Sequence, residues 1–401
     1  MTSGLVIAFR HPVVRISMIA IFLFGFTGAT TGPYQSVVGI TELGLSDGFY
    51  ALLIFTAAIV NVAASLFAGV VADRVGDYRR LLMIVLAFGI AGYGIVYVVP
   101  SQATFVFAML VMVPVYSASN PLLFANVRAI ANAGGGRDAA AINSGVRAAI
   151  SVAWVVVPGL TALALAGSGS MLPAYLMAAL GCAANLALIY FKLPYDRKAA
   201  AVIEARHSYR ASMLEALAPR VFARLMAVSM MTCLLYVNGT VLPLILTGAA
   251  GGHVTDVGAV VGLVAFLEVI FIIVWGNLQV RLGATVSLCV ATVLYTLYLT
   301  LLGFVTARWQ VYALIPLSAF AAAALISIPI TYIQDLIADR PGLGSSLISV
   351  NMFLSGGLAA ILFAIGSRVS DYSGTAILGA LAGLVGVAML LYFERAPTKN
   401  A

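Results

Sequence analysis

A short charged stretch, residues 69–80, separates two long apolar segments and reads GVVADRVGDYRR. Five of these twelve residues are charged, whereas residues 48–68 before them and 81–99 after them carry no charge at all. An α-helix needs about 20 apolar residues to cross the hydrocarbon core of a bilayer. The pattern therefore predicts two transmembrane helices joined by a tight polar turn.

The composition of the whole chain agrees with a protein that lies in lipid. Of its 401 residues, 63% belong to the apolar set AVILMFWYC and only 9% are charged. The surface of a soluble domain needs roughly a quarter to a third of its residues charged. The composition therefore argues against secreted scaffolds, nucleic-acid-binding modules and cytosolic enzymes, despite the net charge of +7.

Charged residues, glycines and prolines divide the rest of the chain into further apolar runs of similar length. Each run is long enough for one crossing. We therefore predict an all-α integral membrane protein with twelve transmembrane helices. The predicted spans are residues 14–38, 48–72, 81–99, 104–127, 141–166, 173–193, 221–247, 255–279, 285–305, 311–335, 344–366 and 375–393.

The basic residues predict the orientation, because cytoplasmic connections retain Lys and Arg. If the N-terminus is cytoplasmic, all but two of the 21 Lys and Arg residues fall on the cytoplasmic side. The two exceptions are Arg308 and Arg368. The asymmetry predicts that both termini are cytoplasmic, and it explains the positive charge without nucleic acid as a partner.

The longest polar stretch, residues 194–219, lies between the sixth and seventh predicted spans and is rich in Arg and Lys. We predict a cytoplasmic linker that faces the lipid headgroups. It separates an N-terminal six-helix bundle, residues 1–193, from a C-terminal six-helix bundle, residues 220–401.

The two predicted bundles share a weak internal repeat. An offset of 207 positions superposes three pairs of residues, which are Gly69 and Gly276, Arg74 and Arg281, and Gly76 and Gly283. Pro121 and Pro329 are 208 positions apart. Together with the division into six and six spans, the repeat predicts two pseudo-symmetric halves related by an axis along the membrane normal.

The thiols and imidazoles give no sign of a metal or cofactor site. The three cysteines lie far apart inside apolar stretches, which favours free core thiols, and they are Cys182, Cys233 and Cys289. The three histidines lie in polar connections without other ligands at metal-binding spacing, and they are His11, His207 and His253. The chain also lacks a phosphate-binding P-loop, which argues against an ATP-driven pump.

The charged stretch at 69–80 resembles the G-x-x-x-D-R-x-G-R-R loop of the major facilitator superfamily. The residues that carry the resemblance are Gly69, Asp73, Arg74, Gly76, Arg79 and Arg80, with one residue more than usual before the Arg pair. The resemblance implies the fold of that superfamily, in which this loop latches the two halves on the cytoplasmic side. We expect Arg128, Asp335 and Arg340 to belong to the same gate. A plain cluster of orienting charges is the alternative.

Two further segments are similar to the sugar efflux transporters, a bacterial branch of that superfamily. Residues 147–159 read RAAISVAWVVVPG and resemble the stretch R-A-x-x-S-x-A-W-V-x-G-P-P. Residues 334–342 read QDLIADRPG and resemble Q-D-L-x-x-x-R-x-G. Val157 replaces a glycine of that branch and Gly159 replaces its second proline, and these departures bear on the substrate.

One carboxyl group lies near the middle of a predicted span. Glu268 is surrounded in sequence by apolar residues and has no cation beside it. Transfer out of water favours the neutral form of a carboxyl group, so a carboxyl that ionises in one state and protonates in another can couple proton flow to transport. Arg147, inside the fifth span, is a candidate partner for Glu268, a gate residue or substrate contact, or a side chain that snorkels to the cytoplasm. A structural carboxyl is the alternative for Glu268.

Uncharged polar and aromatic side chains in the spans are candidates for substrate binding. The ring of Trp154 could stack on the C–H face of a sugar, and a packing or lipid-facing ring is the alternative. Amides supply both donors and acceptors to hydroxyl groups, and the candidates are Gln35, Asn61, Asn120, Asn238 and Asn351. For each amide, hydrogen bonding between helices is the alternative.

These observations predict a secondary transporter, not an enzyme, that works by alternating access around a central site. The resemblance implies proton-coupled efflux of sugars or small glycosides across the bacterial inner membrane by a multi-pass monomer. Its partners would be a sugar, protons and the lipid bilayer, with no nucleic acid and no cofactor. A multidrug or amphiphile exporter on the same fold remains the alternative.

Overall fold

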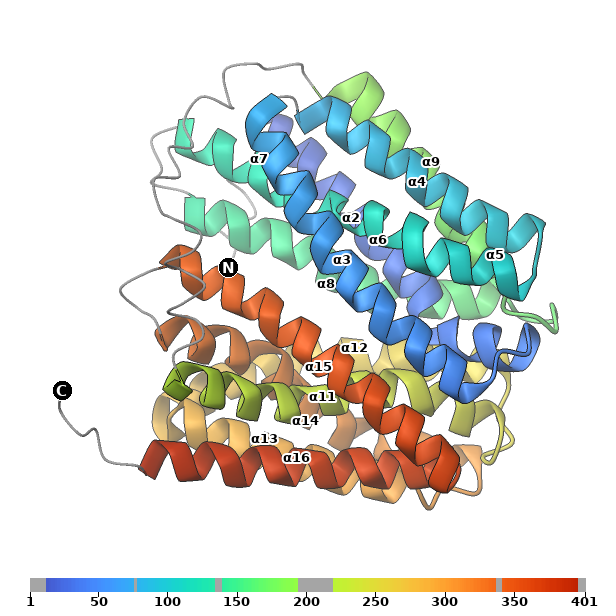
Figure 1. Cartoon of the computed structure of the whole chain (residues 1–401), viewed down its shortest axis with the longest axis vertical. Helices are drawn as coiled ribbons and strands as arrows, with labels where there is room; N and C mark the ends of the chain where they lie inside the picture. The colour runs from blue at the N-terminus through green and yellow to red at the C-terminus, as the bar shows by residue number, and fades with distance from the viewer. Residues whose placement is uncertain (1–11, 76–77, 134–138, 194–218, 337–340, 396–401) are drawn as a thin grey trace. The chain divides into compact units, whose positions relative to one another are not determined.

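The computed structural model describes residues 12–75, 78–133, 139–193, 219–336 and 341–395, and the regular elements within these ranges are helices (Figure 1). Residues 194–218 of the predicted linker lie outside the described part. The chain forms two compact units. Unit 1 comprises Met1–Leu45 and Thr56–Ala205, and unit 2 comprises Ser46–Phe55 and Arg206–Ala401.

Helices of the first half of the chain are coloured blue to green in Figure 1. They are α2 (Pro12–Thr31), η1 (Gly32–Tyr34), η2 (Val37–Glu42), α3 (Asp47–Val75), α4 (Tyr78–Val98), α5 (Gln102–Phe107), η3 (Ala108–Met112), α6 (Val113–Ser117), α7 (Ser119–Ala133), α8 (Ala139–Ala164) and α9 (Pro173–Lys192).

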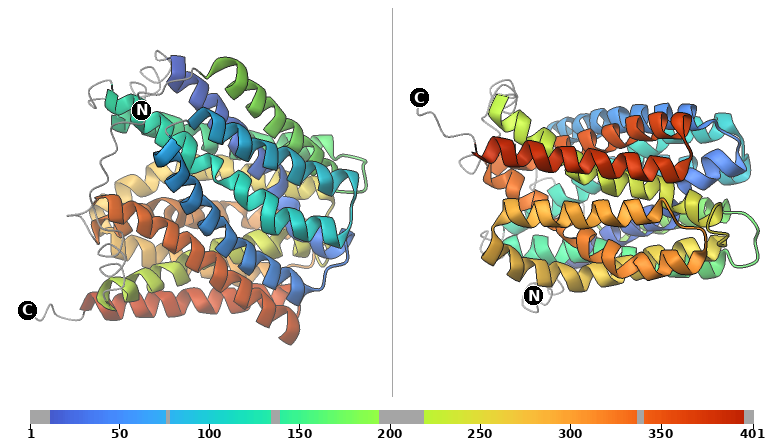
Figure 2. Two further views of the ribbon diagram at one scale, coloured as in Figure 1. Left: turned by 45° about the horizontal axis from the view of Figure 1, so that its top comes forward. Right: turned by 90° about the horizontal axis from the view of Figure 1, so that it is seen from below.

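Helices of the second half are coloured yellow-green to red in Figure 2. They are α11 (Pro219–Thr247), α12 (Val254–Leu282), α13 (Ala284–Leu302), α14 (Arg308–Asp335), α15 (Pro341–Val369) and α16 (Tyr372–Arg395).

The membrane-spanning character of the predicted segments is confirmed. Within the described ranges, eleven helices are long and apolar enough to cross a bilayer. The predicted span 141–166 coincides with α8, whose described apolar part, Ala148–Ala164, is shorter than the others. The count of twelve crossings is therefore approximate.

The predicted span 104–127 corresponds to one candidate span, Gln102–Phe124, whose helix type changes along its length. Its chain runs through α5, the π-helical η3, α6 and α7. Pro114 lies in the first turn of α6 and has no N–H to donate to the preceding turn. The wider π-helical turn before it, Ala108–Met112, accommodates this break in the hydrogen-bond ladder.

One segment from the first half of the chain belongs to unit 2, and it is Ser46–Phe55, the start of α3. There the hydroxyl group of Tyr372 donates to Oδ1 of Asp47 at 3.0 Å. The ring of Tyr50 packs edge-on against Phe363, with centroids 6.0 Å apart. Both contacts hold the first turns of α3 among the helices of unit 2.

Glycines allow helices to approach closely within unit 2. Three glycines of α16, at the i, i+4, i+7 spacing of one helical face, lie against α11, and they are Gly379, Gly383 and Gly386. A Cβ added at Gly383 would lie 2.6 Å from Cδ1 of Leu234. Association of helices in lipid relies on this kind of backbone approach, because lipid tails are as apolar as the side chains.

Gly89 of α4 makes an equally close approach in unit 1 and yields a stability prediction. A Cβ added there would lie 2.5 Å from Cδ2 of Tyr116 and 2.8 Å from Sγ of Cys182. Because both neighbours are buried, we expect Gly89→Ala to lower the free energy of unfolding by about 1–3 kcal/mol. Thermal or denaturant unfolding of the purified protein in detergent would measure this change.

Gly94, on the same helix, provides the matched control. No atom lies within 4 Å of a Cβ added there. We expect Gly94→Ala to leave stability unchanged or to raise it by up to about 1 kcal/mol, because alanine is the better helix former. Equal destabilisation by both substitutions would contradict a steric role for Gly89.

Candidate functional site

Glu268 lies at one end of a chain of polar side chains that links four helices of unit 2. The carboxyl group is half-buried on α12, and the buried Tyr295 of α13 is its electrostatic neighbour. Ser318 of α14 lies within hydrogen-bonding reach of the hydroxyl groups of both Tyr295 and Tyr298. Tyr298 in turn donates to Oδ1 of Asn238 on α11 at 2.9 Å. We call these five residues the tyrosine cluster.

Geometry within the tyrosine cluster follows from helix periodicity. Tyr295 and Tyr298 are three positions apart on α13, so they lie on one face of the helix. Their ring centroids are 5.1 Å apart. Buried tyrosines need partners for their hydroxyl groups, and Asn238 of α11 accepts from Tyr298. The cluster therefore contains two predicted residues, Glu268 and Asn238, of which Asn238 is hydrogen-bonded to a tyrosine.

No described Lys or Arg forms an ion pair with Glu268. Arg147 lies within α8, but its side chain is outside the described part of the structure. A pair between Arg147 and Glu268 therefore stays a prediction.

The two units repeat positions of this cluster. Helices α3 and α12 both contain 29 residues, and the offset of 207 superposes their ends, Asp47 on Val254 and Val75 on Leu282. The same offset superposes Asn61 on Glu268. Asn61 is half-buried and accepts a hydrogen bond from Ser65 through Oδ1 at 3.4 Å.

A second contact is repeated near the ends of the first helices of the two halves. The offset of 207 superposes Thr31 on Asn238. Thr31 of α2 lies near Tyr93 of α4, and Asn238 of α11 accepts from Tyr298 on α13. In each unit a tyrosine of the third long helix therefore lies close to this position of the first. These tyrosines were missed by the sequence analysis, although their spacing and apolar surroundings could have indicated them.

Trp154 packs on a glycine of α2 and a glycine of η1 in unit 1. A Cβ added at Gly32 would lie 3.3 Å from the indole ring, and one added at Gly28 would lie 3.7 Å from it. Val157, which replaces a glycine of the sugar efflux branch, is 1% exposed and packs in the same cluster with Ala29. The valine side chain, which is larger than the glycine that it replaces, packs between α2 and α8. A substrate contact by Trp154 stays a prediction.

Asn351, another predicted substrate residue, is buried between α15 and α11. Its Oδ1 accepts from Oγ of Ser229 at 2.9 Å, and its Nδ2 donates to Oγ1 of Thr232 at 3.4 Å. Thr232 also shares a hydrogen bond of 2.7 Å with Ser355. These four residues form a ladder between the two helices, so Asn351 is engaged in interhelical hydrogen bonding.

Two further amide candidates belong to unit 1. Asn120 on α7 is half-buried, and its Oδ1 is buried without a hydrogen-bond partner among the described residues. Gln35 is half-buried and follows the short helix η1. Their part in substrate binding stays a prediction.

Comparison with known proteins identifies the family. The model of the MFS_1-like family matches residues 13–389. Sugar efflux transporter A of Dickeya chrysanthemi is 27% identical over 387 residues, which cover 94% of each chain. Sugar efflux transporter B of Salmonella typhimurium is 27% identical over 349 residues, 86% of this chain and 87% of that one.

This chain belongs to the MFS_1-like family.

Solved structures support the fold of an MFS_1-like transporter. The nucleoside transporter NupG has a TM-score of 0.76 at 14% identity and covers 95% of this chain and 99% of its own. The peptide transporter POT in complex with sulfate has a TM-score of 0.74 at 15% identity and covers 96% of this chain and 94% of its own. The predicted superfamily and transporter class are therefore confirmed, and the chain is a transporter rather than an enzyme.

Only part of the predicted cytoplasmic gate of this MFS_1-like protein is described. Arg79 of α4 donates to the backbone oxygen of Tyr190 on α9 at 2.6 Å, and its guanidinium carbon lies 5.8 Å from the centroid of that ring. Asp335 is exposed at the end of α14. Gly69, Asp73, Arg74 and Arg128 lie in helices, but no side-chain contact of theirs is described. Gly76 and Arg340 are outside the described residues.

Two clusters of charged and tyrosine side chains link helix ends within unit 2. Glu394 lies 3.5 Å from Nε of Arg224 and accepts from the hydroxyl group of Tyr332 at 2.7 Å. Asp256 accepts from the hydroxyl group of Tyr312 at 2.8 Å. Both clusters tie α14 to a neighbouring helix.

The Asn351 ladder yields a prediction that separates packing from binding. Asn351→Ala leaves Ser229 and Thr232 without their amide partner, so we expect the free energy of unfolding to fall by about 1 kcal/mol. The KM for the transported solute is expected to stay unchanged. Unfolding in detergent and transport in proteoliposomes would measure the two quantities.

Asn277 on α12 serves as the control for this amide. It is exposed and donates only within its own helix, to the backbone oxygen of Ile273 at 3.2 Å. We expect Asn277→Ala to leave stability within about 0.5 kcal/mol of the original. A large rise in KM for Asn351→Ala with unchanged stability would identify Asn351 as a substrate contact instead.

Proposed function

We propose that this protein exports sugars or small glycosides from the cytoplasm by proton-coupled alternating access. The observation that carries the proposal is the match along 94% of the chain to a relative named as a sugar efflux transporter. The exporter works as a monomer in the bacterial inner membrane, with both termini cytoplasmic. Cys labelling of the 194–219 stretch in intact cells tests this orientation.

The polar side chains of the spans suit a neutral, hydroxyl-rich solute. Asn61, Asn120 and Asn238 present amides, and the tyrosine cluster presents hydroxyl groups, whereas Glu268 contributes the cluster's one ionisable carboxyl group. Sugar hydroxyl groups both donate and accept hydrogen bonds, as amides do. Aromatic faces such as Trp154 add stacking on the sugar ring.

Glu268 carries the proton in this proposal. It has no cationic partner among the described side chains, and its neighbours along α12, such as Leu267 and Val269, are apolar. Such an environment favours the neutral carboxyl, and access of water or a polar solute favours release of the proton. Exchange of proton for solute at this group would couple the two fluxes.

Solute counterflow in proteoliposomes tests the substrate class. We expect preloaded protein-containing vesicles to accumulate a labelled sugar or glycoside at a rate that saturates and rises with an imposed pH gradient. Uptake of a lipophilic cation dye is expected to equal that of protein-free vesicles. Dye transport without sugar counterflow would identify an amphiphile exporter and contradict the proposal.

Replacement of Glu268 by Gln tests the coupling. The amide keeps the size and hydrogen bonding of the neutral carboxyl but cannot exchange a proton. We expect the ratio of transport rates with and without a pH gradient to fall to about 1 in Glu268→Gln, while counterflow at equal pH persists. Both rates are measured with the same labelled sugar.

Glu394→Gln is the matched control for this substitution. Glu394 lies at the end of α16, where it contacts Arg224 and Tyr332 rather than the tyrosine cluster. Its replacement should leave the response to the pH gradient intact. If Glu268→Gln also keeps the full response, Glu268 has no part in coupling, although the sugar substrate would stand.

A further inference from the structure

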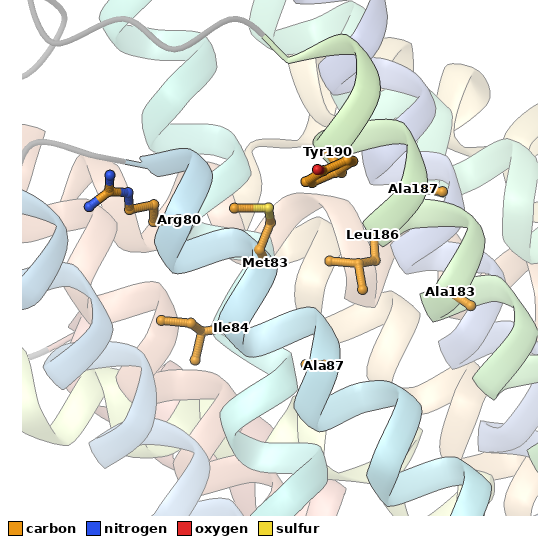
Figure 3. Close-up of a pocket in the computed structure, with 8 residues that line it drawn as sticks. All are labelled: Arg80, Met83, Ile84, Ala87, Ala183, Leu186, Ala187 and Tyr190. Carbon is orange, nitrogen blue, oxygen red and sulfur yellow. The ribbon is translucent and has the colours of Figure 1, made fainter.

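A groove of about 790 Å³ runs along unit 1 between the antiparallel helices α4 and α9. Four lining residues come from α4 at the i, i+3, i+4, i+7 spacing of one helical face, and they are Arg80, Met83, Ile84 and Ala87. Four come from α9 at the same spacing, and they are Ala183, Leu186, Ala187 and Tyr190 (Figure 3). Its volume falls within the range of about 300–1,000 Å³ typical of ligand pockets.

The groove is apolar along most of its length. Small side chains, Ala87, Ala183 and Ala187, line it where a larger residue would fill the space, and Met83 and Leu186 come from its two sides (Figure 3). Ile84 is 55% exposed, although both helices are apolar enough to span a membrane. In a bilayer such a surface is covered by hydrocarbon, because water does not reach it.

One end of the groove is cationic. Arg80 lines this end, where α4 begins and α9 ends. Lys192 is exposed in the last turn of α9, two residues after Tyr190. A pocket that is apolar at membrane depth and basic at the helix ends has the charge pattern that binds the headgroup of an anionic lipid.

Tyr190 forms a fixed wall between these two regions. Arg79 donates to its backbone oxygen at 2.6 Å, and the guanidinium group lies over its ring with 5.8 Å between the guanidinium carbon and the centroid. The ring is thereby held at the boundary between the apolar and basic parts. Tyrosine is enriched at this level of a membrane, where one side of the ring is apolar and the other is polar.

We propose that the α4–α9 groove is a binding site for one anionic glycerophospholipid, with an acyl chain along Ala87, Ala183 and Ala187 and the phosphate group at Arg80. This proposal does not depend on the proposed function. Hydrocarbon burial and the phosphate contact act together, so neither a neutral lipid nor a free phosphate should occupy the groove equally well.

Native mass spectrometry of the full chain, released from detergent after incubation with defined lipids, tests the proposal. We expect one phosphatidylglycerol to be retained in preference to phosphatidylcholine. Arg80→Gln should weaken this retention roughly fivefold, since one basic residue near an anionic headgroup contributes about that factor. Ala187→Phe, which fills the groove, should reduce it at least as much.

Two controls match these substitutions. Arg281→Gln removes an exposed charge from the last turn of α12, and Leu297→Phe enlarges an exposed apolar residue of α13. Neither should change the retention of phosphatidylglycerol. Ala87→Leu is a milder filling substitution, which replaces Ala187→Phe if that variant does not fold, as judged by thermal unfolding.

The results of these measurements distinguish a bound lipid from a free anion in the groove. Loss of lipid in Arg80→Gln and in a groove-filling variant, with both controls unchanged, supports the proposal. Displacement of the lipid by glycerol phosphate, or loss in Arg80→Gln with no effect of either filling variant, would show that only a free anion or surface charge is recognised. Equal loss in Arg281→Gln, equal retention in all variants, or a dimer that carries no lipid would overturn it.

Discussion

Hydrocarbon offers no hydrogen-bond partner, and this constraint determines how the polar side chains of the spans are used. Several hydroxyl groups donate to the backbone of their own helix one turn earlier, as Thr31 does to Thr27 at 2.8 Å and Thr292 does to Leu288 at 2.7 Å. Others pair between helices, as Thr27 does with Tyr116 at 2.7 Å. Glu268 differs from these hydroxyl groups, because it is an ionisable group at the middle of a span and no ion pair of it is present among the described residues, which calls for a functional explanation.

The two units solve one packing problem with different chemistry. In unit 1, α2 meets α8 through small side chains, and a Cβ added at Gly25 would lie 2.9 Å from that of Ala153. In unit 2, α11 meets α15 through the hydrogen-bonded ladder that includes Thr232 and Ser355. The offset of 207 aligns Gly25 with Thr232 in the sequence. At this position unit 1 has a glycine that lets α2 and α8 approach closely, whereas unit 2 has a threonine that forms a hydrogen bond between α11 and α15. Both devices are stable in lipid, because each compensates for the absence of a hydrophobic driving force between helices.

The fold could be predicted from the sequence because a bilayer imposes a length and a polarity on each helix. An uninterrupted apolar run such as 255–279 predicts a helix without any knowledge of its tertiary contacts. The observed helix α12 covers this run and extends over Val254–Leu282. The π-helical break before Pro114 could not be located in this way, since it depends on which backbone hydrogen bonds the neighbouring turns retain. The shift of Ser46–Phe55 into unit 2 depends on contacts with residues more than 300 positions away, such as Tyr372.

For the site, the sequence singled out polar residues but not their partners. Glu268 and Asn238 stood out because each is polar within an apolar run, and the structure connects both to the tyrosine cluster. Asn351 stood out for the same reason, yet its amide is engaged by Ser229 and Thr232. A lone amide in an apolar run has the same appearance in either role, because the difference lies in whether a hydroxyl group from another helix faces it.

The repeat of 207 positions also bears on why one carboxyl group differs from its counterpart. The offset of 207 aligns α3 with α12 end to end in the sequence, and it aligns Asn61 with Glu268. An amide and a carboxylic acid have similar size and hydrogen-bonding capacity, but only the acid exchanges a proton. If both positions border the solute path, the two halves of the chain supply two polar side chains for the solute. Only one of them, Glu268, carries the energetic cost of an ionisable group in lipid. A second carboxyl at position 61 would double that cost and, where the two groups interact, make the protonation of each depend on the other. The asymmetry thus allows one proton-exchanging group to act on an otherwise neutral set of hydrogen-bonding side chains.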